Sequence, residues 1–450
     1  MCGIIGVLSR RPTRPVPDSD DLVARLDAAL GRRDDVPAAT RHLTEIDALL
    51  RGVPGVVALA DQHETVTSIV ARLDQLDAIA DTFDAALEAG GHDPETVELM
   101  SARSLALRDV LWAIRHDRLR TAREVGALAG RDAGIGSLSG YLAIQQAFSA
   151  LDRLEVRGRD SAGIHVFVSE HGLDLDEPTV QAALGDRAQD PTYPSGSVRV
   201  SDGVLSFVYK AAAEIGELGD NTRALRAAVA GDELLRRALA GPDAKTSVLG
   251  HTRWASVGII SEPNTHPLNS DEMETSPSIE RGPYVVGALN GDVDNHADLR
   301  VAHQLRIHTH ITTDAKVIPT MVSRHAASGI PVAEAFRRTV SAFEGSVAVA
   351  AMSADAPDTM LLALRGSGQG LYVGLADDCF IAASEPYGVV EETNEYIRMD
   401  GESGGEVIVL DAANAGERAG IGRISYDGGD LPVTDDDIVT AEVTTRDIDR

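Results

Sequence analysis

Two patterns of hydrophobic positions divide the chain. Residues 3–8 form a short, β-branched apolar run, which is typical of a buried strand. From about residue 18 to 145, apolar residues instead recur every three or four positions, as on one face of a helix. We therefore predict an all-α segment of about three to five helices over residues 18–145. The longest helix has its apolar positions at Val66, Ile69, Val70, Leu73, Leu76, Ala80, Phe83 and Leu87.

Glycine and proline mark where the predicted helices end and begin. Gly90 and Gly91 are expected to stop the long helix, since glycine accepts a left-handed conformation. Asp93 is then expected to cap the next helix, with Pro94 at its first position. Shorter helical patterns cover 20–30 and 40–50. This segment is either a partner-binding module or a passive insertion, and the absence of a chemistry-bearing cluster favours the insertion.

Beyond Tyr141 the pattern becomes mixed. Many short strands with intervening helices indicate an α+β layered domain, and its strands need residues 3–8 as a partner. The helical segment is thus an insertion, with 1–17 and 146–450 forming one discontinuous domain around 18–145. The predicted helices lie near 141–154, 220–240, 313–328 and 331–343. The predicted strands are His165–Val168, Ser197–Tyr209, Ser247–Gly250, Tyr284–Leu289, Ser346–Ala351, Met360–Leu364, Gly370–Val373, Cys379–Ala383 and Glu406–Leu410.

Composition and charge narrow the function. The formal net charge of −29 disfavours nucleic acid as a partner. The chain has only two cysteines, Cys2 and Cys379, which excludes a disulfide framework and fits a reducing cytosol. No apolar run is long enough for a transmembrane helix, and no basic region precedes the first apolar run. We therefore expect a cytoplasmic protein without membrane contact, whose self-association is left open.

Cys2 is the first candidate for chemistry. Removal of Met1 would leave Cys2 with both a thiol and a free α-amine. Their ordinary pKa values, about 8.5 and about 7.7–8.0, are nearly matched, so the amine can take the thiol proton. The competing interpretation is an inert cysteine, because most second-position cysteines have no catalytic role.

Three later segments carry further candidates. In residues 250–258, Arg253 could grip a carboxylate, or could stack on Trp254 for structure. In residues 287–300, Asn290 and the N–H of Gly291 could meet an oxyanion, or could form a hairpin turn.

Asp294 and Asn295 are expected to cap a helix that begins near His296. Asp314 could cap a helix or hold an ammonium. No acid or thiolate joins His303, His308 and His310 at convincing spacing, so we expect surface histidines and no metal site.

Taken together, these segments resemble the class II glutamine amidotransferases, and within that class the glutamine–fructose-6-phosphate aminotransferases. The resemblance covers residues 2–8 and about 146–410. The motifs occur in the family's order: Met-Cys-Gly-Ile-Ile-Gly at the start, Leu154-Glu-Val-Arg-Gly-Arg-Asp-Ser-Ala-Gly163, His251-Thr-Arg-Trp254, Asn264-Thr-His-Pro267, Asn290-Gly291 with Asn295-His296, and Thr313-Asp314.

The resemblance implies a four-layer αββα sandwich of the N-terminal-nucleophile hydrolases, without a cofactor. It assigns the nucleophile and base to Cys2, and the oxyanion hole to Asn290 and Gly291. The remaining roles it implies concern substrate: Arg253 for the α-carboxylate with Ser256 beside it, Asp314 for the α-ammonium, Trp254 for the ammonia gate, His266 for shaping the glutamine loop, and Arg157 and Asp160 for a loop around the pocket.

This sequence departs from the family at Val257, Arg159 and Lys316, where histidine, an aromatic residue and an acid are usual. The resemblance implies hydrolysis of L-glutamine to L-glutamate, with the ammonia used to convert fructose 6-phosphate to glucosamine 6-phosphate. The sugar-phosphate isomerase domains are expected to be absent from this chain and supplied in cis or in trans. Two alternatives remain: an amidohydrolase acting on another acyl amide, and a non-catalytic scaffold working through its helical insertion.

Overall fold

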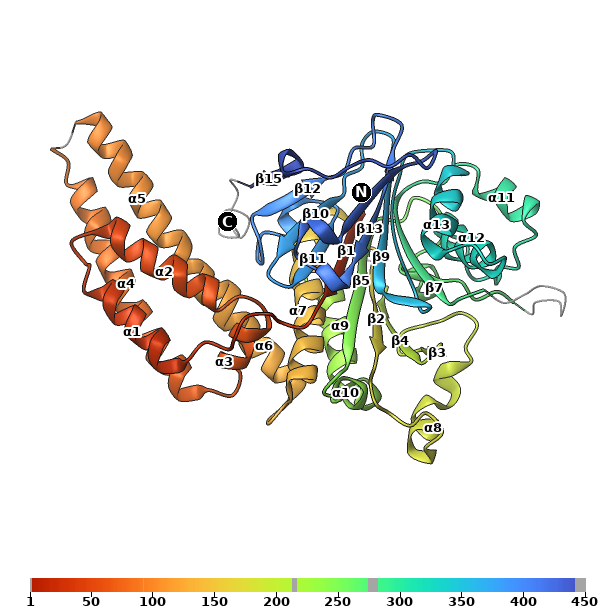
Figure 1. Cartoon of the computed structure of the whole chain (residues 1–450), viewed down its shortest axis with the longest axis horizontal. Coiled ribbons are helices and arrows are strands. Elements are labelled where there is room, and N and C mark those ends of the chain that lie inside the picture. The colour runs from red at the N-terminus through yellow and green to blue at the C-terminus, as the bar shows by residue number, and fades with distance from the viewer. Residues whose placement is uncertain (1, 92, 213–216, 274–281, 442–450) are drawn as a thin grey trace. The chain divides into compact units, whose positions relative to one another are not determined.

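The chain forms two compact units. A computed structural model describes residues 2–91, 93–212, 217–273 and 282–441. One unit comprises Met1–Arg11 with Ser139–Glu442, and the other comprises Pro12–Leu138. The first is a mixed helix-and-strand structure and the second is helical (Figure 1).

The helical unit follows the predicted amphipathic pattern. The residues that α4 buries include Ile69, Leu73, Leu76 and Ala80, which lie on the predicted face. Gly90 has a φ of 77° just after α4, and the Asp93 carboxylate accepts the Thr96 N–H at 3.0 Å at the start of α5. The elements are α1 (Ser19–Leu30), α2 (Val36–Leu49), α3 (Gly52–Leu59), α4 (His63–Glu88), α5 (Pro94–Trp112), a π-helical stretch (Ala113–Leu119) and α6 (Arg120–Ala129).

The other unit is built on two antiparallel sheets. Their strand orders are β15-β12-β10-β11-β1-β5-β2-β4-β3 and β14-β13-β9-β8-β7-β6. The strands of the first sheet are β1 (Gly3–Ser9), β2 (Ser161–Ser169), β3 (Val198–Ser201), β4 (Val204–Ala211), β5 (Lys245–Arg253), β10 (Tyr372–Ala376), β11 (Cys379–Ala383), β12 (Glu395–Arg398) and β15 (Ile438–Thr440). Those of the second are β6 (Leu268–Asn269), β7 (Val285–Gly291), β8 (Val347–Ser353), β9 (Ala356–Arg365), β13 (Glu406–Asp411) and β14 (Ile421–Ser425).

The sheets pack face to face through one apolar core, to which Ile4, Leu249, Ala288 and Met360 contribute. Helices cover both outer faces (Figure 1). A second core joins the outer side of β7 and β8 to α12 and α13. The remaining helices are α7 (Ile135–Leu154), α8 (Pro178–Leu184), α9 (Asp220–Ala230), α10 (Glu233–Leu239), α11 (His296–Ala302), α12 (Val317–Ala327) and α13 (Val332–Ser341). The predicted four-layer αββα sandwich with a large all-α insertion is confirmed.

Strand β1 lies in the middle of the first sheet. Ile5 pairs with Ala383 of β11 on one side and with Gly250 of β5 on the other. Helix α7 approaches this strand closely, because a Cβ on Gly3 would lie 2.8 Å from the Cβ of Leu154. The N-terminal end of β1 is thus fixed from both edges and from its outer face.

One predicted strand was wrong. The run Ser197–Tyr209 is not a single strand but the hairpin of β3 and β4. Asp202 and Gly203 have φ values of 51° and 76° and form its two-residue turn. Such an Asp-Gly pair favours the left-handed turn that suits the twist of a hairpin, and this local signal overrides the continuous apolar pattern.

Lys210 is a cation buried between the sheets. Its side chain is 4% exposed, and Nζ has no hydrogen-bond partner among the described residues. Nζ lies 5.8 Å from the centre of the Tyr193 ring. Burial, assisted by the charge of Lys316, lowers the pKa of Lys210 from 10.5 to about 7. At neutral pH the folded state therefore bears a desolvation cost at this residue.

We expect Lys210→Met to stabilise the protein by about 2 kcal/mol at pH 6–7, because it removes this cost and keeps the side-chain length. The unfolded lysine titrates near 10.5 and the folded one near 7, so the cost is fully present below pH 7 and fades as the pH rises toward 10.5. Amide hydrogen exchange of β2 and β4 at several pH values measures the effect. A difference between wild type and variant that does not shrink from pH 7 to pH 9 would contradict the argument.

Candidate active site

Cys2 lies buried directly before the central strand β1. The Trp254 backbone N–H donates to its Sγ at 3.3 Å, and Sγ lies 3.5 Å from the Trp254 carbonyl oxygen. Burial raises the pKa of the Cys2 thiol, and the Trp254 N–H opposes this by favouring the thiolate. The thiol is therefore held in one place by the backbone that follows β5.

Asp160 holds that backbone in position. Its carboxylate accepts the Ala255 N–H at 2.7 Å, and its own N–H donates to the Arg253 carbonyl at 3.1 Å. Residues 253–255 are thus fixed on both sides of Trp254, so that the Trp254 N–H points at the sulfur. Asp160 was expected in a loop around the pocket; the side chain of Arg157, expected there too, lies outside the described residues.

Asn290 brings the second sheet to the cysteine. It is 2% exposed near the end of β7, and its Oδ1 accepts the Cys2 N–H at 3.2 Å. Because a backbone N–H can only donate, this contact identifies the oxygen of the Asn290 amide. The Nδ2 donors are therefore turned to the other side, where they can meet an oxyanion.

Gly291 occupies a position that only glycine fits. Its φ is 110°, and a Cβ there would lie 2.0 Å from the Ser346 carbonyl oxygen. The hairpin-turn interpretation of Asn290-Gly291 is wrong, because both residues belong to β7 and pair with Ala348 and Val347 of β8. Glycine is needed here because the backbone of the neighbouring strand approaches it closely, not because the chain turns.

Arg253 is turned into the loop that follows it. Its guanidinium is 2% exposed and donates to the carbonyls of Ile259, at 3.1 Å, and Val257. Burial lowers its pKa, while the charges of Cys2, Asp314 and Asp160 act in the opposite direction. Two of its N–H groups are thus engaged in shaping residues 254–259. The alternative of stacking on Trp254 is not seen among the described ring contacts.

The other residues predicted for the substrate lie around this loop. Trp254 is 58% exposed, whereas Asp314 is 4% exposed and accepts the Val293 N–H at 2.8 Å. Burial raises the pKa of Asp314. The Ser256 hydroxyl donates to Asp292 at 2.8 Å. Asn295 precedes α11 as predicted, but its side chain bonds to Ala342 and Glu344 instead of capping the helix.

His266 lies beneath the site and not at its surface. It is 3% exposed, and its ring centre lies 4.5 Å from that of His251. The Leu289 N–H donates to its Nδ1 at 3.5 Å, which leaves the proton on Nε2, 3.3 Å from the Thr313 hydroxyl. Burial lowers its pKa well below 6.5, so the ring is neutral. Its contacts join β7 to the segment that carries Asp314.

Asp292 is a residue at the site that we did not predict. It follows Gly291, accepts the Ser256 hydroxyl, and its charge raises the pKa of both Cys2 and Asp314. The sequence signal was its place directly after the Asn-Gly pair. Lys316, where the family has an acid, is instead buried, and donates from Nζ to the Asn269 side chain at 2.8 Å and the Asp271 carbonyl at 2.8 Å.

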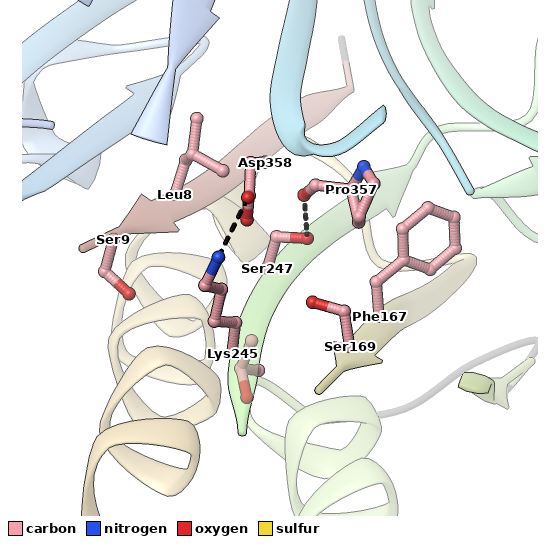
Figure 2. A pocket seen from close by; sticks show the side chains of 9 residues that line it. Leu8, Ser9, Phe167, Ser169, Lys245, Ser247, Pro357 and Asp358 are labelled. Carbon is pink, nitrogen blue, oxygen red and sulfur yellow. Dashed lines mark hydrogen bonds and ion pairs between the residues drawn. The ribbon is translucent and has the colours of Figure 1, made fainter. Parts of the chain in front are cut away.

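A pocket at the other end of β1 lacks this chemistry (Figure 2). It lies beside Leu8 and Ser9, about 20 Å from Cys2 at about 3.3 Å per strand residue. In it Lys245 pairs with Asp358 at 3.1 Å, and the Ser247 hydroxyl donates to the Pro357 carbonyl at 3.4 Å.

Within the described ranges no group of three or more His, Cys, Asp or Glu side chains could hold a metal, and no helix there is long and apolar enough to cross a membrane.

Comparisons with known proteins find relatives of one kind. No family model matches the chain. The glutamine–fructose-6-phosphate aminotransferase (isomerizing) of Geobacillus kaustophilus is 28% identical over 272 residues, which is 60% of this chain and 35% of that protein. The Bacillus subtilis enzyme of the same name is 32% identical over 173 residues, which is 38% of this chain and 26% of that protein. The chain thus spans about a third of the length of the curated relatives it matches.

A solved structure of glutamine phosphoribosylpyrophosphate amidotransferase from B. subtilis is 18% identical, with a TM-score of 0.39 over 63% of this chain and 46% of that one. A TM-score this low supports no inference. The sequence relatives and the ordered motifs agree, and the unit that contains β1 is similar to the glutamine amidotransferases of class II.

Proposed function

We propose that this domain hydrolyses the side-chain amide of L-glutamine to L-glutamate and ammonia, with Cys2 as the nucleophile. The observation that carries the proposal is the convergence at Cys2. Its Sγ lies 3.3 Å from the Trp254 N–H, and its backbone nitrogen lies 3.2 Å from Asn290 Oδ1. Cys2, the Trp254 backbone and the Asn290 amide thus meet from three distant parts of the chain, which supports a nucleophile that carries its own base beside an oxyanion donor.

The first half of the reaction forms a thioester. Once Met1 is removed, the nitrogen of Cys2 becomes an amine with an ordinary pKa of about 7.7–8.0, which can accept the thiol proton. The sulfur attacks the amide carbon, and the Asn290 Nδ2 and Gly291 N–H donate to the oxygen that becomes negative. The carbon–nitrogen bond then breaks, and the amine returns the proton to the leaving ammonia.

The second half releases glutamate. The amine of Cys2 takes a proton from water, the hydroxide adds to the thioester carbon, and the carbon–sulfur bond breaks to restore the thiol. Arg253 and Asp314 would hold the α-carboxylate and α-ammonium, so that the amide carbon stays over the sulfur through both halves. Trp254, with its exposed indole, and Ser256 would border the entrance, while His266 supports the strand beneath.

The test is glutamate release from glutamine by protein whose Met1 is removed, together with the mass of its N-terminal peptide. A glutamine analogue with an electrophilic carbon in place of the amide should add one equivalent of label to Cys2. Retained Met1, or release of no glutamate by fully processed protein, would refute the proposal.

We further propose that the ammonia serves an acceptor domain carried in cis or in trans, and that the acceptor is fructose 6-phosphate. The support is the name of the relatives, which this chain matches over about a third of their length. Supplying a sugar-phosphate isomerase protein, fructose 6-phosphate and glutamine should yield glucosamine 6-phosphate. Formation of glutamate without any amino sugar would refute this acceptor while leaving the glutaminase proposal intact.

A further inference from the structure

Asp292 lies directly beside the proposed oxyanion pair, Asn290 and Gly291. It directly follows Gly291, and its N–H donates to the Ser346 carbonyl at 3.2 Å, which fixes its backbone beside the oxyanion pair. Its exposed side chain accepts the Ser256 hydroxyl at 2.8 Å, so the carboxylate is drawn toward the loop that follows Arg253. Asp292 is thus held by both its backbone and its side chain, and its charge acts on Cys2.

The carboxylates of Asp292 and Asp314 lie near each other, and their charges interact. Within the described ranges, neither Asp292 nor Asp314 makes an ion pair. Asp314 is held by the N–H of Val293, the residue after Asp292, and the charges that interact with it are those of Asp292, His296 and Arg253. Like charges so close repel each other, and a bound ammonium would relieve the repulsion.

Arg253, the cation of the site, interacts with Asp314 only through its charge and forms no ion pair with it in the part of the chain that the structure describes. The Arg253 guanidinium holds the carbonyls of Val257 and Ile259 and is nearly fully buried. The hydrogen bonds of Arg253 are thus made within its own loop, whereas Asp314 is bonded to the residue after Asp292, just beyond β7. A zwitterionic amino acid matches this division of charge, with its ammonium on the acidic side.

We propose that Asp292 joins Asp314 in an anionic subsite that binds the α-ammonium of the substrate, and so selects amides that carry one. The proposal rests on the glutaminase function proposed above and adds a specificity residue to it. The hydrogen bond from Ser256 orients the Asp292 carboxylate but leaves its second oxygen for the ligand.

The experiment compares L-glutamine with glutaramate, which is glutamine without its α-amino group, in Asp292→Asn, Ser256→Ala and the exposed control Asp298→Asn. Asp292→Asn should raise KM for glutamine about tenfold, the ratio that one partly screened charge pair supplies. It should leave kcat for glutamine and kcat/KM for glutaramate within about twofold of wild type. Asp298→Asn should leave kcat and KM unchanged for both substrates.

Three results would overturn the inference. One is an unchanged KM for glutamine in Asp292→Asn. Another is an equal loss for both amides, which a purely structural role would give. The third is the same loss in Asp298→Asn, because the position of the Asp292 carboxylate would then not matter. Ser256→Ala, which removes only the hydrogen bond that orients this carboxylate, should give a smaller loss of the same kind. Wild-type protein that releases no glutamate would instead refute the glutaminase proposal itself.

Discussion

Cys2→Ala is expected to abolish glutamate release, with a loss of at least about a thousandfold, because no other group at the site can form the thioester. Alanine is as small as cysteine, so removal of Met1 and the α-amine are preserved. The buried position before β1 also accepts an alanine without a clash. The change therefore isolates the sulfur from the rest of the site. A coupled assay for glutamate and one for ammonia measure it.

The chain supplies a matched control in its other cysteine. Cys379 opens β11 and is 5% exposed, and burial raises the pKa of its thiol far above the ordinary value. Cys379→Ala should keep glutamate release and keep the label of an electrophilic glutamine analogue on the N-terminal peptide. Turnover that survives in Cys2→Ala but is lost in Cys379→Ala would reverse the assignment of the nucleophile.

Gly291→Ala is expected to lower kcat by roughly a thousandfold while the protein still folds. The new Cβ would lie 2.0 Å from the Ser346 carbonyl, and the φ of 110° is strained for alanine. The end of β7 must therefore move away from β8, which displaces both the Gly291 N–H and the Asn290 amide. Loss of an oxyanion donor costs about 10²–10³ in kcat, and a displacement of about 1 Å costs a further factor.

Gly329→Ala separates backbone strain from the clash. Gly329 has a φ of 82° just after α12, and nothing lies within 4 Å of its missing Cβ. This variant should lose about 1 kcal/mol of stability and no activity. If Gly291→Ala were as active as Gly329→Ala, the oxyanion role of the β7 end would be wrong.

The sequence predicts those parts of the fold that depend on local pattern. The spacing of apolar residues located α4, and Gly90 with Asp93 marked the boundary between α4 and α5. The run at residues 3–8 identified β1 as a buried strand. Patterns of this kind report on one element at a time, so the split of Ser197–Tyr209 into β3 and β4 needed the turn chemistry of Asp202.

The site is harder to predict, because its geometry depends on contacts between distant segments. The ordered motifs indicated Cys2, Asn290 and Gly291, but their roles stay proposals. The sequence did not indicate that Arg253 would be turned toward the carbonyls of its own loop. The sequence also did not single out Asp292 as a site residue, because an acid next to a glycine is common. Only the fold brings Ser256 within hydrogen-bond distance of it.

The pairing of β1 has a consequence for the order in which the chain folds. β1 is synthesised before both of its partners, which are β5, at residues 245–253, and β11, at residues 379–383. Contacts of such long sequence separation form slowly and only after the later strand is synthesised, whereas helical hairpins form from local contacts. The helices of Pro12–Leu138 are therefore expected to fold during synthesis, before β1 has paired with both of its neighbours. A nascent chain stalled before residue 245 would carry folded helices and a β1 without either partner, and one stalled before residue 379 would still lack β11.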